Sequence, residues 1–128
     1  MTSVEIPTSV AAALPTLSVF DITNDVSRSI AASEHEAGLA YVAATSPLAV
    51  VRVTEREAGF FHDFEAMLAR LVPHEVAERE RLIVALLGSR TEQIPFADGR
   101  LCLGQWQRVL LFGFNGDVSA DFALTLVG

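Results

Sequence analysis

The stretch TEQIPFADGRLCLGQWQRVLLFGFNGDVSADFALTLV, residues 91–127, decides the fold class of this chain. It contains Asp98-Gly99 and Asn115-Gly116, two dipeptides that favour the type I′ turn of a β-hairpin, because both central residues of that turn need a positive φ. The residues around them predict four strands, at 91–96, 100–103, 106–114 and 121–127. We therefore expect a largely antiparallel C-terminal sheet with tight hairpins.

Apolar residues at helical spacing precede this region. Residues 58–71 predict a helix that Pro73 ends, with a single apolar stripe formed by Phe60, Phe61, Phe64, Met67, Leu68 and Leu71. A second helix is predicted from about residue 75 to 87. Acidic side chains suit its positive N-terminal end, and Gly88 can close it with a left-handed conformation.

An earlier helix is predicted to begin after Asp21 or Thr23, either of which can accept the free N–H groups of its first turn. Its buried face is predicted to carry Ile22, Val26 and Ile30, which recur at a spacing of four.

The remaining segments complete the order of elements. Short strands are predicted at residues 2–8 and 17–20 with a loop at 11–15 between them, and two more strands at 39–44 and 48–53. Strands before and after a helical block indicate the α+β class, with mostly antiparallel, sandwich-like β-sheets packed against a helical layer. A length of 128 residues suits one domain, residues 1–128.

Composition excludes several classes of protein. The apolar runs are too short for a transmembrane helix, so we expect no membrane partner. The formal charge is −7 and the nine basic residues are all arginine, scattered along the chain, so we expect no nucleic-acid partner. A single cysteine and the absence of a secretory signal favour the cytoplasm. With 51% hydrophobic residues, the chain is apolar for its size, which favours self-association.

Several motifs of the C-terminal half occur together in one known family. They are Ala85-Leu86-Leu87-Gly88-Ser89, Ile94-Pro95, Asp98-Gly99-Arg100-Leu101 and Leu103-Gly104-Gln105-Trp106-Gln107. In this order they resemble the YjbQ-like family, small bacterial and archaeal proteins often labelled putative secondary thiamine-phosphate synthases. Residues 21–23 (DIT), 63–66 (DFEA) and 71–73 (LVP) extend the match upstream. The resemblance implies the YjbQ-like fold and a homotrimer.

The polar residues of that family are largely replaced in this chain. The family's HTTA string falls on residues 46–49 and its NEN string on 54–56, and of these only Ala49 and Glu55 are retained. A family histidine falls on Arg81, and the family arginine after the last turn falls on Val118. In the family these groups imply a metal-associated pocket and a phosphate-bearing ligand, so the resemblance implies a degenerate active site here.

Six residues remain as candidates for a site. Glu55 and His74 are the catalytic candidates, and Ser46, Arg81, Trp106 and Gln107 are the candidates for ligand binding. Three of them have a structural alternative: Ser46 suits a turn, Trp106 suits an aromatic anchor, and Gln107 suits a buried amide that organises a turn.

Neither a metal site nor a nucleophile emerges from the spacing. His35, His62 and His74 lack the i, i+4 spacing or the cysteine pair of a zinc site, so we expect no metal and no cofactor. Ser46 has no Gly-x-Ser-x-Gly context. Cys102 is predicted to be buried within a strand and inert.

Two functions fit these observations. The preferred one is a non-catalytic trimeric scaffold or ligand-binding subunit with a degenerate active site. The alternative is an enzyme that acts on a phosphate ester, similar to a thiamine-phosphate synthase, with a rebuilt site that uses Glu55, His74, Arg81 and Gln107. A small phosphorylated molecule is the ligand that the family resemblance implies.

Overall fold

The structure, a computed structural model, describes residues 9–88, 90–116 and 118–128. The strand predicted at residues 2–8 lies outside the described residues. The described elements, in chain order, are β1 Ser9–Leu14, β2 Leu17–Asp21, α1 Thr23–Ala32, β3 Ala37–Ala44, β4 Ala49–Glu55, α2 Ala58–Leu71, α3 Arg79–Leu87, β5 Thr91–Ala97, β6 Arg100–Leu101, β7 Gln107–Gly113 and β8 Phe122–Val127.

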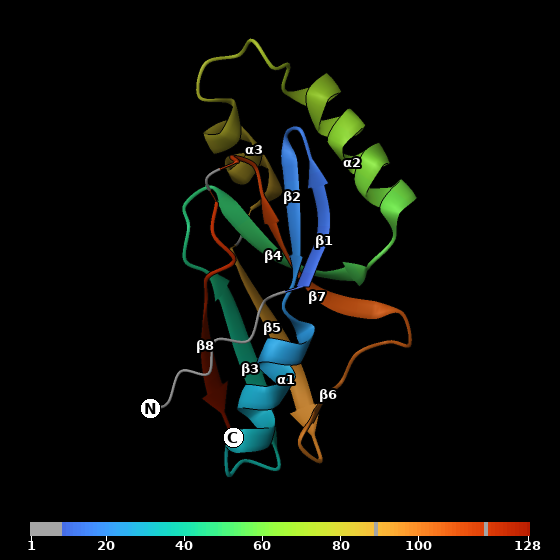
Figure 1. Cartoon of the computed structure of the whole chain (residues 1–128). Helices are drawn as coiled ribbons and strands as arrows, with labels where there is room; N and C mark the ends of the chain where they lie inside the picture. The colour runs from blue at the N-terminus through green and yellow to red at the C-terminus, as the bar shows by residue number, and fades with distance from the viewer. Residues whose placement is uncertain (1–8, 89, 117) are drawn as a thin grey trace.

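The strands form two four-stranded sheets, in the orders β1-β2-β7-β4 and β6-β5-β3-β8 (Figure 1). Every pairing between described strands is antiparallel. The predicted α+β class with antiparallel sheets is therefore confirmed. The last four strands do not form one sheet, however, because β7 lies in the first sheet while β5, β6 and β8 lie in the second.

Of the two hairpins predicted from turn dipeptides, the described part of the chain contains one. Asp98 and Gly99 have φ values of 52° and 71° and connect β5 to β6, so the first hairpin is confirmed. The second is wrong, because β8 pairs with β3 and not with β7. Asn115 instead begins a turn in which Val118 N donates to its carbonyl oxygen at 3.0 Å. Asparagine is common at that first position, where no positive φ is needed.

The loop predicted at residues 11–15 is also wrong. These residues belong largely to β1, which pairs with β2 from Ser9↔Asp21 to Leu14↔Leu17. A run of alanines has little preference for strands, and here pairing with the apolar β2 overrides that weak local preference.

Two apolar clusters hold the layers together, and β7 contributes to both. Val109 and Leu111 join a cluster shared by α1, β3, β4 and β5, whereas Leu110, Phe112 and Phe114 join a cluster under α2 and α3. Successive strand residues point to opposite faces, so a strand buried on both faces reads as one continuous apolar run. This explains why residues 109–114 show no alternation.

The first helix is close to its prediction. Asp21 accepts a hydrogen bond from Thr23 N at 3.1 Å, and the predicted apolar face of Ile22, Val26 and Ile30 is buried.

The predicted bounds of α2 are confirmed. Its apolar stripe is only half buried: Phe61 and Leu68 are in the core, whereas Phe60, Met67 and Leu71 are exposed. The next helix, α3, begins at Arg79, later than predicted, because Glu78 adopts a left-handed conformation with a φ of 55°. Its end at Gly88, whose φ is 86°, agrees with the prediction. No helix in the described part of the chain has the length and apolarity needed to cross a membrane.

Candidate functional site

The six candidate residues do not converge on one place. Ser46 lies in the turn between β3 and β4, where its hydroxyl accepts a hydrogen bond from Leu48 N at 3.1 Å. His74 lies exposed in the connection between α2 and α3. Arg81 is exposed on α3 and pairs with Glu78 at 2.9 Å. None of these three residues lines the cavity that Glu55 and Trp106 share.

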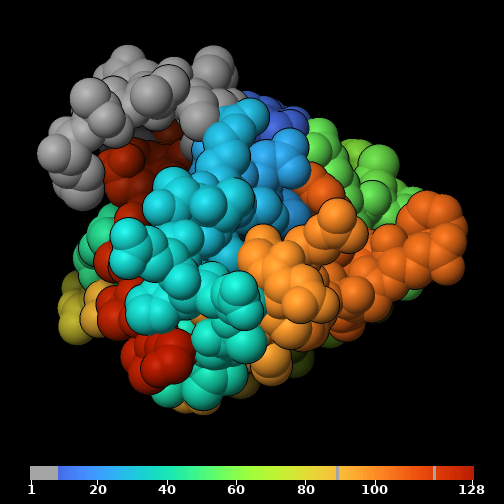
Figure 2. Space-filling model, turned by 90° about the horizontal axis from the view of Figure 1, so that it is seen from below, coloured from blue at the N-terminus to red at the C-terminus, as the bar shows by residue number. Residues whose placement is uncertain are grey.

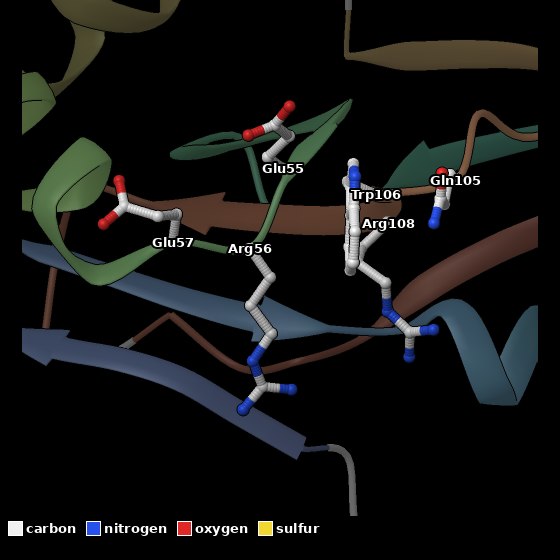
Figure 3. A pocket seen from close by; sticks show the side chains of 6 residues that line it. All are labelled: Glu55, Arg56, Glu57, Gln105, Trp106 and Arg108. Carbon is white, nitrogen blue, oxygen red and sulfur yellow. The ribbon is translucent and has the colours of Figure 1, made fainter.

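Glu55 and Trp106 do come together, because β4 ends beside the start of β7. Glu55 lies directly opposite Gln107 in that pairing. Glu55 and Trp106 line a cavity of about 290 Å³, which we call the Trp106 cavity (Figure 3). Its other lining residues are Arg56, Glu57, Gln105 and Arg108.

The connection from β6 to β7 forms one wall of the Trp106 cavity and projects from the molecule (Figure 2). Gln107 Oε1 accepts a hydrogen bond from Gly104 N at 2.7 Å, which closes this turn. Trp106 is 68% exposed, so its ring does not anchor the core. An exposed indole at the mouth of a cavity offers a flat apolar surface to a ligand.

The two carboxylates of this cavity differ in their surroundings. Glu57 caps α2, because its side chain accepts hydrogen bonds from Gly59 N at 2.8 Å and from Phe60 N at 2.7 Å. Glu55 is exposed and points away from the guanidinium of Arg56 (Figure 3). Neighbouring strand residues point to opposite faces, which is the arrangement expected for Glu55 and Arg56.

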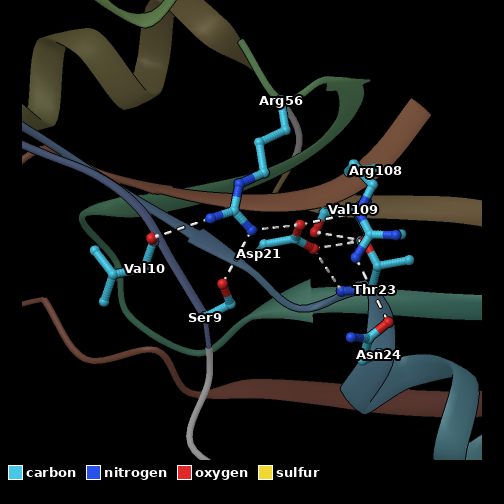
Figure 4. A network of polar contacts seen from close by, with 8 residues as sticks. All are labelled: Ser9, Val10, Asp21, Thr23, Asn24, Arg56, Arg108 and Val109. Atoms are coloured by element: carbon cyan, nitrogen blue, oxygen red, sulfur yellow. Dashed lines mark hydrogen bonds and ion pairs between the residues drawn. The ribbon is translucent and has the colours of Figure 1, made fainter. Parts of the chain in front are cut away.

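Two arginines of the Trp106 cavity, Arg56 and Arg108, both contact one buried carboxylate (Figure 4). Oδ2 of Asp21 accepts from Nη1 of Arg56 at 3.1 Å and from Nε of Arg108 at 2.9 Å. The Asp21 side chain is 1% exposed, whereas those of Arg56 and Arg108 are 39% and 36% exposed. The acid is therefore enclosed while both guanidinium groups reach solvent.

Further hydrogen bonds fix this arrangement. Oδ1 of Asp21 accepts from the Thr23 hydroxyl at 2.7 Å, and that hydroxyl in turn accepts from Val109 N at 2.8 Å. Arg56 also donates to the hydroxyl of Ser9 at 2.9 Å and to the carbonyl oxygen of Val10 at 3.3 Å.

These contacts change the pKa of the Asp21 carboxyl group. Burial disfavours its charged form and acts to raise the pKa of the carboxyl. The hydrogen bonds from Thr23, Arg108 and Arg56 outweigh burial, so the pKa of Asp21 lies below its ordinary value. Asp21 is consequently ionised at neutral pH and holds the two arginines in place.

A second, smaller cavity opens beside this cluster. It has a volume of about 110 Å³ and shares Arg56 and Arg108 with the Trp106 cavity. We call it the arginine cavity. Its other lining residues are Ser9, Asp21, Asn24, Asp25 and Arg28.

No group of three histidine, cysteine or acidic side chains with the geometry of a metal site occurs among the described residues. His35, His62 and His74 are each exposed. The expectation that Cys102 is buried is wrong: β6 ends at Leu101, and Cys102 is exposed.

The sequence did not point to Arg56 and Arg108 as a pair. Each adjoins a candidate, Glu55 and Gln107 respectively, on a strand that was predicted. No local pattern connects either arginine to Asp21, however, which is 35 positions from Arg56 and 87 from Arg108. The pairing of β7 with both β2 and β4 brings the three residues together.

Comparison with known proteins agrees with this fold. A family model described as UPF0047 protein YjbQ-like matches residues 12–128. The chain belongs to this family. A UPF0047 protein of Archaeoglobus fulgidus is 29% identical over 106 residues, which cover 77% of this chain and 82% of the relative.

Solved structures of YjbQ-like proteins have the same fold. A YjbQ/UPF0047 family protein of Clostridium acetobutylicum gives a TM-score of 0.78 at 22% identity, covering 95% of this chain and all of its own (100%). A hypothetical protein of Aeropyrum pernix gives a TM-score of 0.77 at 26% identity, covering 88% and 90% of the two chains.

Proposed function

We propose that this YjbQ-like protein is a non-catalytic, ligand-binding member of its family with a degenerate active site. The observation that carries this proposal is the separation of the reactive candidates. Glu55 lies at the end of β4, His74 in the connection between α2 and α3, and Arg81 on α3 in a surface pair with Glu78. General acid–base catalysis requires such groups within hydrogen-bond reach of the same substrate atoms.

The Trp106 cavity supports ligand binding at the end of β4. It offers the exposed Trp106, the side chains of Arg56 and Arg108 in its lining, and a volume of about 290 Å³. Small-molecule sites combine an apolar surface with a few polar groups that fix orientation, and they commonly begin at about this volume. We place Trp106 at this site as a ligand-binding residue, with Gln107 fixing the turn that carries it.

The proposal includes a homotrimer in the cytoplasm. Exposed apolar side chains on α2 and α3, including Phe60, Leu71, Leu82 and Leu86, support self-association. Light scattering of the purified protein should give three times 13.8 kDa. A mass of 13.8 kDa at micromolar concentration would contradict the trimer and leave ligand binding untouched.

Two measurements on the purified protein test this function. The first is an assay of thiamine-phosphate synthase activity. The second is a titration of the protein with candidate phosphorylated ligands, followed by the fluorescence of its sole tryptophan, Trp106. We expect turnover at background and a change in Trp106 fluorescence. Arg81→Gln is a control, because Arg81 lies outside the Trp106 cavity. This variant should show the same fluorescence change as the unaltered protein.

The alternative is an enzyme acting on a phosphate ester with a rebuilt site. One observation favours it: Glu55 lines the same cavity as Arg56 and Arg108, which brings a carboxylate base and two cations to one place. Turnover above background that is lost in Glu55→Gln would establish this alternative and overturn the non-catalytic proposal.

A further inference from the structure

We propose that Arg28, Arg56 and Arg108 form a binding site for an oxyanion, a phosphate or carboxylate group, in the arginine cavity. The inference deepens the proposed function by naming the chemical group that this end of the molecule recognises. It rests on the proposed ligand binding and on the charges and hydrogen bonds of residues that the sequence resemblance did not indicate.

The balance of charge in the arginine cavity is positive. Its lining includes three arginines, Arg28, Arg56 and Arg108, and two aspartates, Asp21 and Asp25. The whole chain carries a formal charge of −7, so a local excess of positive charge is unusual for this protein. This excess of one positive charge in a concave site favours an anion over a cation.

The two arginines that hold Asp21 retain donors for a second partner. In the described part of the chain, Nε of Arg56 and Nη1 of Arg108 donate to no protein atom. A guanidinium carries five N–H groups in a fixed plane, which suits two-point contact with a carboxylate or phosphate. Asp21 thus holds both groups in place while leaving part of each available.

Arg28 has a different role from the other two. It is exposed on α1, and among the described residues its interaction is the electrostatic attraction to Asp25, without a hydrogen bond. The network around Asp21 does not need it. Among the described residues no N–H group of Arg28 donates a hydrogen bond, so its guanidinium can donate to an anion in the cavity.

The size of the arginine cavity limits the ligand group. A volume of about 110 Å³ holds a few water molecules at ~30 Å³ each, and so accommodates one phosphate, sulfate or carboxylate. Asn24 and Ser9 add an amide and a hydroxyl to its lining. The Trp106 cavity shares Arg56 and Arg108 and has room for the organic part of a larger ligand.

The experiment is calorimetric titration of the full chain with inorganic phosphate, inorganic pyrophosphate and acetate, at one ionic strength set with sodium chloride. Arg28→Gln removes a guanidinium that makes no hydrogen bond within the described chain, so folding should be unaffected. Arg70→Gln, in the last turn of α2, removes the same charge at an exposed position away from both cavities and is the control.

We expect at least one of these anions to bind and Arg28→Gln to weaken its binding about tenfold, the usual effect of losing one hydrogen bond to a charged group. Arg70→Gln should bind as the unaltered protein does. Phosphate without acetate would assign a phosphorylated ligand, and binding of both would assign the shared oxyanion chemistry.

Two results would overturn the inference: no anion binds at millimolar concentration, or Arg28→Gln and Arg70→Gln weaken binding equally. These results are separate from the test of the proposed function. Catalytic turnover would refute a non-catalytic protein yet leave the anion site standing. A Trp106 response to an uncharged ligand, with no anion bound, would refute the anion site and leave ligand binding standing.

Discussion

Nε of Arg108 donates to Oδ2 of Asp21 at 2.9 Å, although the two residues are 87 positions apart in the sequence. The contact joins the start of β7 to the end of β2, at the place where the first sheet meets α1. Because the Asp21 side chain is 1% exposed, its charge depends on this partner and on Arg56 for compensation.

The first prediction concerns acid stability. The pKa of Asp21 is lowered in the folded protein, so its ionised form favours folding. This contribution is fully present above the pKa of the unfolded chain, about 3.9. It is lost as the pH falls through the lower folded value. Chemical unfolding at a series of pH values should show stability falling below about pH 4.

Asp21→Asn should remove this part of the acid dependence. At neutral pH it should also lower the free energy of unfolding by about 2 kcal/mol, because it removes the charged acceptor of the hydrogen bonds from Thr23, Arg56 and Arg108. Asp63→Asn, at an exposed position on α2, is the control and should change little. An Asp21→Asn protein with unaltered stability at neutral pH would show that the buried carboxylate does not organise this region.

The second prediction concerns the contact between α2 and the turn after β1. Glu65 accepts hydrogen bonds from the backbone N–H of Thr16 at 2.8 Å and from its hydroxyl at 2.9 Å. Glu65→Ala should lower the free energy of unfolding by about 2 kcal/mol, since it removes two hydrogen bonds to a charged group. Urea unfolding measures this loss, and Thr16→Val, which removes only the hydroxyl contact, should lose less. Equal losses would mean that the backbone contact contributes nothing.

The third prediction uses two neighbouring phenylalanines. Phe61 is 1% exposed in the cluster under α2, whereas Phe60 is 40% exposed. Phe61→Ala should destabilise the fold by about 4 kcal/mol, the usual cost of truncating a buried aromatic side chain. Phe60→Ala should cost less than about 1 kcal/mol in a monomer. A large loss in Phe60→Ala that depends on protein concentration would place Phe60 in a subunit interface.

The fourth prediction concerns the close approach of β3 to the C-terminal end of β8. A Cβ atom added at Gly38 would overlap the carbonyl group of Val127 and lie 2.8 Å from the Cα of Gly128. Both contacts are with backbone, which cannot rotate away as a side chain can. Gly38→Ala should therefore lower the melting temperature and increase amide hydrogen exchange in β8. Gly116→Ala, which meets no atom within 4 Å, is the control and should leave both measurements unchanged.

The candidate site shows how far local sequence information extends. Glu55, Trp106 and Gln107 were identified from short motifs, and the pairing of β4 with β7 brings all three to one end of the first sheet. His74 and Arg81 were identified in the same way and lie elsewhere, on the connection and helix that follow α2. A motif gives the order of residues along the chain, but the distance between two motifs depends on strand pairing.

The sequence by itself determined the features that depend on local interactions. The periodicity of residues 58–71 set the bounds of α2, and Asp98-Gly99 set the hairpin of β5 and β6, because helical periodicity and a type I′ turn are properties of neighbouring residues. Only the tertiary structure decided that β8 joins β3 and that Asp21 receives Arg56 and Arg108. Strand pairing is determined by the apolar surface that the paired strands bury. This burial depends on residues from the whole core, which no local stretch of sequence contains.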